Sequence, residues 1–97
     1  MAMHNPPHPG EFITDIYLEP NGISGRELAG KLDVAASTLS HILKGSSRVT
    51  PEMALRLSKA IGRSPESWLA MQDAHDLWLA RQSLDLTRVS KLKLAVA

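Results

Sequence analysis

Two Ser/Thr-Pro pairs, Thr50-Pro51 and Ser64-Pro65, restrict the fold of this chain more than any other feature. A Ser or Thr side chain accepts a hydrogen bond from the free amides of a helix's first turn. Proline suits the first helical position because its missing N–H needs no partner there. We therefore expect one helix to begin at Pro51 and another at Pro65. Apolar residues follow Pro51 at helical spacing up to Gly62.

Similar start and stop signals predict three earlier helices. Pro9 suits the first turn of a helix that ends near Leu18, before Pro20-Asn21-Gly22. Ser24 and Glu27 have the spacing of a capping box, and Gly45 is a good left-handed helix terminator. The chain is therefore predicted to be all-α. The five expected helices are 9–18, 24–32, 36–44, 51–61 and 65–83.

A chain of 97 residues with these five predicted helices is expected to form one domain. We expect the proline-rich residues 1–8 to form an irregular N-terminal arm, because proline removes backbone donors and favours extended geometry. Residues 9–63 are predicted to form the helix-turn-helix core, and residues 64–85 a long C-terminal helix. In the tail, residues 86–97, Lys and Leu alternate, which fits either an extended strand or a frayed end.

Composition limits the compartment and the chemistry. The chain has no cysteine, which excludes a disulfide framework, a cysteine zinc site and a thiol nucleophile and fits a reducing compartment. The N-terminus lacks the pattern of a signal peptide, and no apolar run approaches the roughly 18 residues of a membrane span. We expect a cytoplasmic protein with no membrane partner.

Charge is distributed unevenly, although the net charge is only +1. Residues 24–63 carry seven Lys or Arg against three Asp or Glu, whereas residues 64–85 carry one Arg against four acidic residues. A chain with separate basic and acidic segments can present one face to an anionic polymer and another to a different partner.

The second and third predicted helices have the pattern of a helix-turn-helix, whose second helix enters the DNA major groove. Ala29 is small enough for the two helices to approach closely. Val34 can fill the turn, and Leu39 with Ile42 or Leu43 can face the core.

The remaining side chains of the second helix must then face outward. Small hydroxyls let a helix approach DNA closely, His can contact a guanine or a phosphate, and Lys and Arg bind phosphates. A solvated helix face is the alternative for any single Ser or Thr. The candidate DNA-binding residues are Ser37, Thr38, Ser40, His41 and Lys44 in the helix, and Ser47 and Arg48 in the following loop.

These motifs resemble a known family. "HPGE" at residues 8–11, "TLSHILKG" at 38–45 and "TPEMALRLSKAIGRSPESWLAMQ" at 50–72 are together similar to the lambda-repressor-like helix-turn-helix of HigA/VapI antitoxins, over roughly residues 5–85. Many such proteins have Gly where this chain has Asp33, so we expect a slightly strained left-handed turn there.

The resemblance implies a type II toxin–antitoxin function. It implies a homodimer that binds a palindromic operator in its own promoter and neutralises a RelE/ParE-like, mRNA-cleaving toxin (a HigB-like RNase). It also implies that the candidate residues of the second helix read the DNA. A stand-alone transcriptional regulator without a toxin is the alternative, and a protein-interaction module without DNA binding is a third hypothesis.

The last helix has more apolar surface than a small monomer easily covers. We predict that Trp68 belongs to the core. Leu77, Trp78 and Leu84 are the predicted dimer interface, with completion of the monomer core as the alternative for the tryptophans.

No enzyme or cofactor is expected. The four histidines, at positions 4, 8, 41 and 75, have no metal-ligand spacing, and no catalytic triad or glycine-rich phosphate loop can be assembled.

Overall fold

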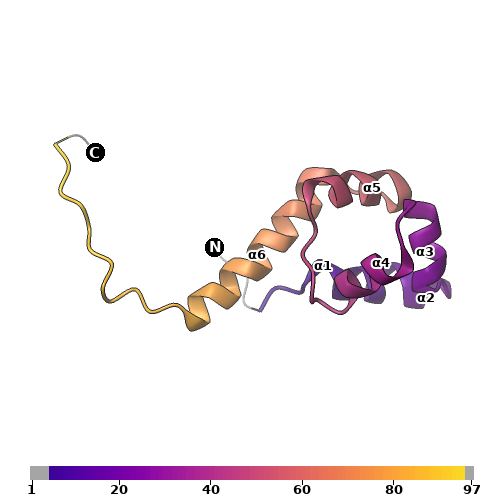
Figure 1. Cartoon of the computed structure of the whole chain (residues 1–97), viewed down its shortest axis with the longest axis horizontal. Coiled ribbons are helices and arrows are strands. Elements are labelled where there is room, and N and C mark those ends of the chain that lie inside the picture. The colour runs from indigo at the N-terminus through magenta and orange to yellow at the C-terminus, as the bar shows by residue number, and fades with distance from the viewer. Residues whose placement is uncertain (1–4, 96–97) are drawn as a thin grey trace.

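The computed structural model describes residues 5–95, so residues 1–4 of the predicted arm and residues 96 and 97 of the predicted tail lie outside it. Within the described range the chain forms helices and no strand, which confirms the all-α prediction. The elements are α1 (Pro9–Ile13), η1 (Thr14–Leu18), α2 (Glu19–Asn21), α3 (Gly25–Leu32), α4 (Ala36–Leu43), α5 (Pro51–Ile61) and α6 (Pro65–Ser83) (Figure 1). Because α1, η1 and α2 are continuous, the described chain has the five predicted helical segments.

The predicted caps begin three of the helices. The side-chain oxygen of each cap accepts a hydrogen bond from the amide three residues ahead, which satisfies a free donor of the first turn. The pairs are Ser24 Oγ with Glu27 N at 3.1 Å, Thr50 Oγ1 with Met53 N at 3.2 Å, and Ser64 Oγ with Ser67 N at 3.0 Å.

The predicted end of the first helix near Leu18 is wrong. The helix continues through a π-helical turn, η1, and then through α2, and it ends where Gly22 is left-handed with φ 63°. In η1 the hydrogen bonds are offset by one residue, and the Glu19 amide donates to the Thr14 carbonyl. Pro20 therefore falls in the first turn of α2, where a missing N–H is tolerated.

Trp68 lies at the centre of the core, as predicted, and is fully buried. Its ring packs edge-on against Phe12 with 6.0 Å between centroids, and its indole N–H donates to the Gly62 carbonyl at 3.0 Å. A buried indole needs such an acceptor. The first helical segment and α6 are thereby joined around one side chain.

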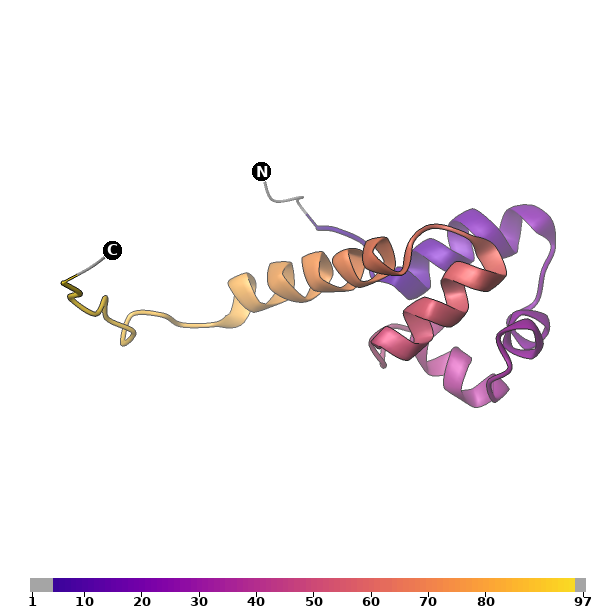
Figure 2. The same ribbon diagram turned by 90° about the horizontal axis from the view of Figure 1, so that it is seen from above.

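The molecule is elongated, with principal extents of 55 × 25 × 24 Å. The first half of α6 packs on the core, whereas its second half projects away from the other helices (Figures 1 and 2). Residues 84–95 continue outward as an exposed, irregular segment without strand structure.

Candidate nucleic-acid interface

The turn between α3 and α4 has the geometry expected for a helix-turn-helix. Ala29 is 2% exposed, and Val34 packs against the core as the predicted filling of the turn. Asp33 is left-handed with φ 57°. The Val34 amide donates to the Ala29 carbonyl and the Asp33 amide to the Gly30 carbonyl, which together form a Schellman motif.

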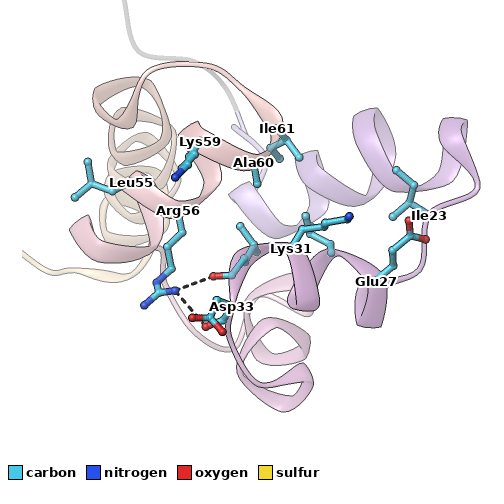
Figure 3. A pocket seen from close by; sticks show the side chains of 11 residues that line it. Ile23, Glu27, Lys31, Asp33, Leu55, Arg56, Lys59, Ala60 and Ile61 are labelled. Carbon is cyan, nitrogen blue, oxygen red and sulfur yellow. Dashed lines mark hydrogen bonds between the residues drawn. The ribbon is translucent and has the colours of Figure 1, made fainter.

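Arg56 of α5 stabilises this turn from the side. Its Nη1 donates to the carbonyls of Leu32 at 2.7 Å and Asp33 at 3.1 Å, at the negative end of α3 (Figure 3). These residues line part of a pocket of about 680 Å³ between α3 and α5. By binding these carbonyls, the Arg56 guanidinium helps to hold Asp33 in the left-handed conformation.

The inner side of α4 is fixed by the core and by α1. Leu39 and Ile42 are 1% and 3% exposed. A β-carbon added to Gly10 of α1 would lie 2.8 Å from both the Ile42 carbonyl carbon and the Leu43 Cα. The backbones of α1 and α4 are therefore in direct contact, and this contact sets the position of α4.

The outer side of α4 carries the predicted polar residues. Ser37, Thr38, His41 and Lys44 are exposed, and Ser40 is half-buried. Ala35, at the N-cap of α4, provides no side-chain hydrogen bond to the first turn. The amides at this end of α4 are thus available to an external acceptor such as a phosphate.

The loop after α4 is held against the helix end. Gly45 is left-handed with φ 81°, as predicted. The His41 carbonyl accepts hydrogen bonds from the amides of Ser46 and Ser47 and from the Ser46 hydroxyl. The exposed Ser47 is thereby held close to the polar face of α4.

The second predicted loop residue, Arg48, contacts α6. Its Nη2 lies 3.0 Å from Asp76 Oδ2 and 3.4 Å from Asp73 Oδ1, yet its side chain is 55% exposed. The hydrogen bond to Asp76 is the main reason why the pKa of Arg48 lies above its ordinary value. Gln72, next to Asp76 on α6, accepts a hydrogen bond from the amide of Val49.

Sequence reasoning did not find Gln72, Asp73 or Asp76. Their spacing on α6 is helical, but Arg48 lies 25 and 28 residues away from its two acidic partners. No local pattern points from the loop to that part of α6.

His8 connects the N-terminal arm to the same region. It is buried, and its Nδ1 accepts a hydrogen bond from the Gly10 amide at the start of α1. Its ring packs edge-on against His75, whose Nδ1 is 2.9 Å from the Pro6 carbonyl. Burial, followed by the charge of His75, lowers the pKa of His8.

The predicted dimer residues lie on or just beyond the projecting half of α6. Leu77 and Leu84 are 51% and 62% exposed, and Trp78 is half-buried. Among residues 5–95 no group of three or more His, Cys, Asp or Glu side chains could hold a metal ion. None of the described helices is both long and apolar enough to cross a membrane.

The fold and the polar face of α4 define a class, the helix-turn-helix DNA-binding proteins. The helix-turn-helix family model matches residues 16–68. The chain is 42% identical over 92 residues to the uncharacterized HTH-type transcriptional regulator YddM of Escherichia coli K12, covering 95% of this chain and 97% of that one. It is 39% identical over 72 residues to antitoxin HigA-1 of Vibrio cholerae, covering 74% and 68%.

A solved structure agrees with these relatives. Pseudomonas aeruginosa antitoxin HigA with the higBA promoter superposes with a TM-score of 0.76 at 32% identity, covering 80% of this chain and 85% of that one. The chain belongs to the HigA/VapI antitoxin family. Proteins of this family are DNA-binding regulators and not enzymes, in agreement with the sequence-based prediction.

Proposed function

We propose that this protein is the antitoxin of a type II toxin–antitoxin module, which binds the operator of its own operon as a homodimer and neutralises a RelE/ParE-like, mRNA-cleaving toxin in the cytoplasm. The observation that carries the DNA-binding part is the exposed polar face of α4, whose opposite side packs on the core and on α1. The P. aeruginosa HigA structure with its promoter supports the same assignment.

The proposed contacts divide into two kinds. Ser37, Thr38 and His41, with the half-buried Ser40, lie where side chains of a recognition helix meet base edges. Lys44, Ser47 and Arg48 lie at and beyond the end of α4, where phosphate contacts fix the register of the helix.

A salt titration tests the phosphate role of Lys44. Binding to the DNA upstream of the gene is measured by gel shift at several salt concentrations. We expect Lys44→Ala to weaken binding and to reduce the slope of log K against log salt by about one, because one phosphate contact is lost. Lys59→Ala on α5, which also removes one exposed lysine, is the matched control and should leave the slope unchanged. An equal slope for both variants would contradict the role of Lys44.

The base-reading role has a different signature. Substitution of Ser37 or His41 should change the preference among operators with single base-pair changes, and not simply the overall affinity. No sequence-specific shift by the wild-type protein at moderate salt would refute the DNA-binding function.

A homodimer follows from the short recognition helix. One helix reads only a few base pairs, so two copies on half-sites about one DNA turn apart are needed for useful specificity. We expect Leu77→Asp, Leu84→Asp and Trp78→Ala to shift sedimentation toward the monomer. Leu55→Asp, which changes an equally exposed leucine on α5, should leave the dimer intact.

The toxin distinguishes the leading proposal from its alternative. A stand-alone transcriptional regulator is the second candidate, because the chain is also similar to YddM, an uncharacterized HTH-type transcriptional regulator. If an adjacent gene encodes a small basic toxin that arrests growth, co-expression of this chain should restore growth. The two proteins should also form a complex in a pull-down. Growth arrest that this chain does not relieve would favour the stand-alone regulator.

A further inference from the structure

We infer that Gln72 and Asp76 of α6 are positioning residues for DNA binding, which fix the loop after the recognition helix and aim the guanidinium of Arg48. The inference rests on the proposed DNA-binding function. It concerns two residues that do not lie on the polar face of α4.

Gln72 is the buried part of the arrangement. Its side chain is 1% exposed, its Oε1 accepts the Val49 amide at 2.8 Å, and its Nε2 donates to Asp76 Oδ1 at 3.0 Å. A buried amide that loses such partners is costly, so this side chain has one favourable orientation. Val49, which is itself fully buried, is thereby tied to α6.

Asp76 completes the connection to Arg48. One carboxylate oxygen accepts from Gln72 and the other from Arg48 at 3.0 Å. Partial burial raises the pKa of Asp76, but the hydrogen bonds from Arg48 and Gln72 outweigh it and hold the pKa below its usual value. The carboxylate cannot rotate without losing one of its two partners.

The loop is therefore held at both ends. At its start, the His41 carbonyl binds the amides of Ser46 and Ser47. At its end, the neighbouring residues Arg48 and Val49 bind Asp76 and Gln72, which lie one turn apart on α6. Arg48 has five N–H donors, and with its side chain 55% exposed it can bind a phosphate while Asp76 holds it.

Asp73 provides a matched control for charge. It contacts the same Nη2 of Arg48 at the longer distance of 3.4 Å, and its side chain is 68% exposed. Within residues 5–95 its hydrogen bond goes to Arg48, and not to Gln72 or Val49. Any carboxylate near DNA repels phosphates, so a general charge effect predicts tighter binding when either acid is neutralised. If Asp76 positions Arg48, neutralising Asp76 should instead weaken DNA binding, whereas neutralising Asp73 should not.

The test uses the full chain and its upstream DNA, with affinity measured by fluorescence anisotropy against salt. We expect Arg48→Ala, Asp76→Asn and Gln72→Met each to weaken binding about tenfold and to lower the salt slope by about one, because each removes or misdirects one phosphate contact. Asp76→Asn should not weaken binding further in an Arg48→Ala background, because the group that Asp76 aims is gone. Asp73→Asn should bind as tightly as wild type or more tightly.

Hydrogen exchange of the Val49 amide provides a readout that needs no DNA. Gln72→Met should accelerate this exchange, because the amide loses its acceptor. If Gln72→Met does not fold, Asp76→Asn still tests the inference, because the Asp76 side chain is partly exposed and its substitution leaves the core intact. The inference is overturned if Asp76→Asn binds like Asp73→Asn, or if it weakens binding equally without Arg48. If the wild-type chain binds no DNA, the proposed function fails, and unchanged Val49 exchange would then separately refute the loop anchoring.

Discussion

The contact between Gly10 and α4 predicts that one added methyl group will destabilise the whole protein. A β-carbon at position 10 would lie 2.8 Å from the Ile42 carbonyl carbon and the Leu43 Cα. Real β-carbons essentially never approach other atoms within 3.0 Å, and these neighbours are backbone atoms that cannot rotate away. Gly10→Ala therefore requires α1 and α4 to separate.

The expected magnitude follows from this geometry. Overpacking in a core typically costs 1–3 kcal/mol, and close contact with several backbone atoms of α4 places Gly10→Ala near the upper end, at about 3 kcal/mol. For a domain of this size each kcal/mol lowers Tm by roughly 4–8 °C, so we expect a decrease of about 12–24 °C. Thermal unfolding followed by circular dichroism, with urea unfolding for the free energy, measures both quantities.

Gly30→Ala is the matched control. Gly30 lies within α3, is exposed, and has no atom near the position of an added β-carbon. Alanine is a better helix former, so Gly30→Ala should stabilise the protein by about 1 kcal/mol. A Gly10→Ala variant within about 0.5 kcal/mol of wild type would refute the close packing of α1 on α4, because such a change is typical of a tolerant surface site.

Three other substitutions test separate features. Asp33→Gly should raise the unfolding free energy, measured with urea, by about 0.5–1 kcal/mol, because glycine adopts the left-handed conformation without strain. The backbone carbonyl of residue 33 would still accept the hydrogen bond from Arg56. A less stable variant would show that the aspartate side chain contributes more stability than its strained backbone costs. Thr50→Ala should lower the unfolding free energy by about 1 kcal/mol through loss of the cap on α5, and an unchanged midpoint would contradict the capping role. Since burial lowers the pKa of His8 below 6.5, the unfolded chain binds a proton more readily, and wild-type stability should fall as the pH drops below about 6.5. His8→Asn, which can still cap α1, should show a smaller fall in unfolding experiments between pH 7 and pH 5; parallel pH curves would exclude His8 as the cause.

The start of most helices could be predicted from the sequence because capping is local. Thr50 and Ser64 each bond an amide three residues ahead, so the signal and its effect lie within one turn. The inward side of α4 and the burial of Trp68 were also predictable, because they follow from the spacing of apolar residues. The polar face of α4 is what remains when those positions are buried.

The path of the first helix through Pro20 was not predictable in this way. Proline normally ends a helix, and only the π-helical turn in η1 moves Pro20 into a first turn. The partners of Arg48 and Val49 were likewise not predictable from the sequence. Asp76 lies 28 residues beyond Arg48, and Gln72 lies 23 residues beyond Val49, both on another helix.

The sequence alone thus determined the helical class, most helix boundaries, and the candidate DNA-reading residues from Ser37 to Lys44. Those features depend on interactions within about one helical turn and on apolar periodicity. Tertiary structure decided how closely α1 approaches α4 at Gly10, and which side chains of α6 hold Arg48. Those contacts arise only when distant helices pack together, because packing brings into hydrogen-bond distance residues whose separation along the chain carries no pattern.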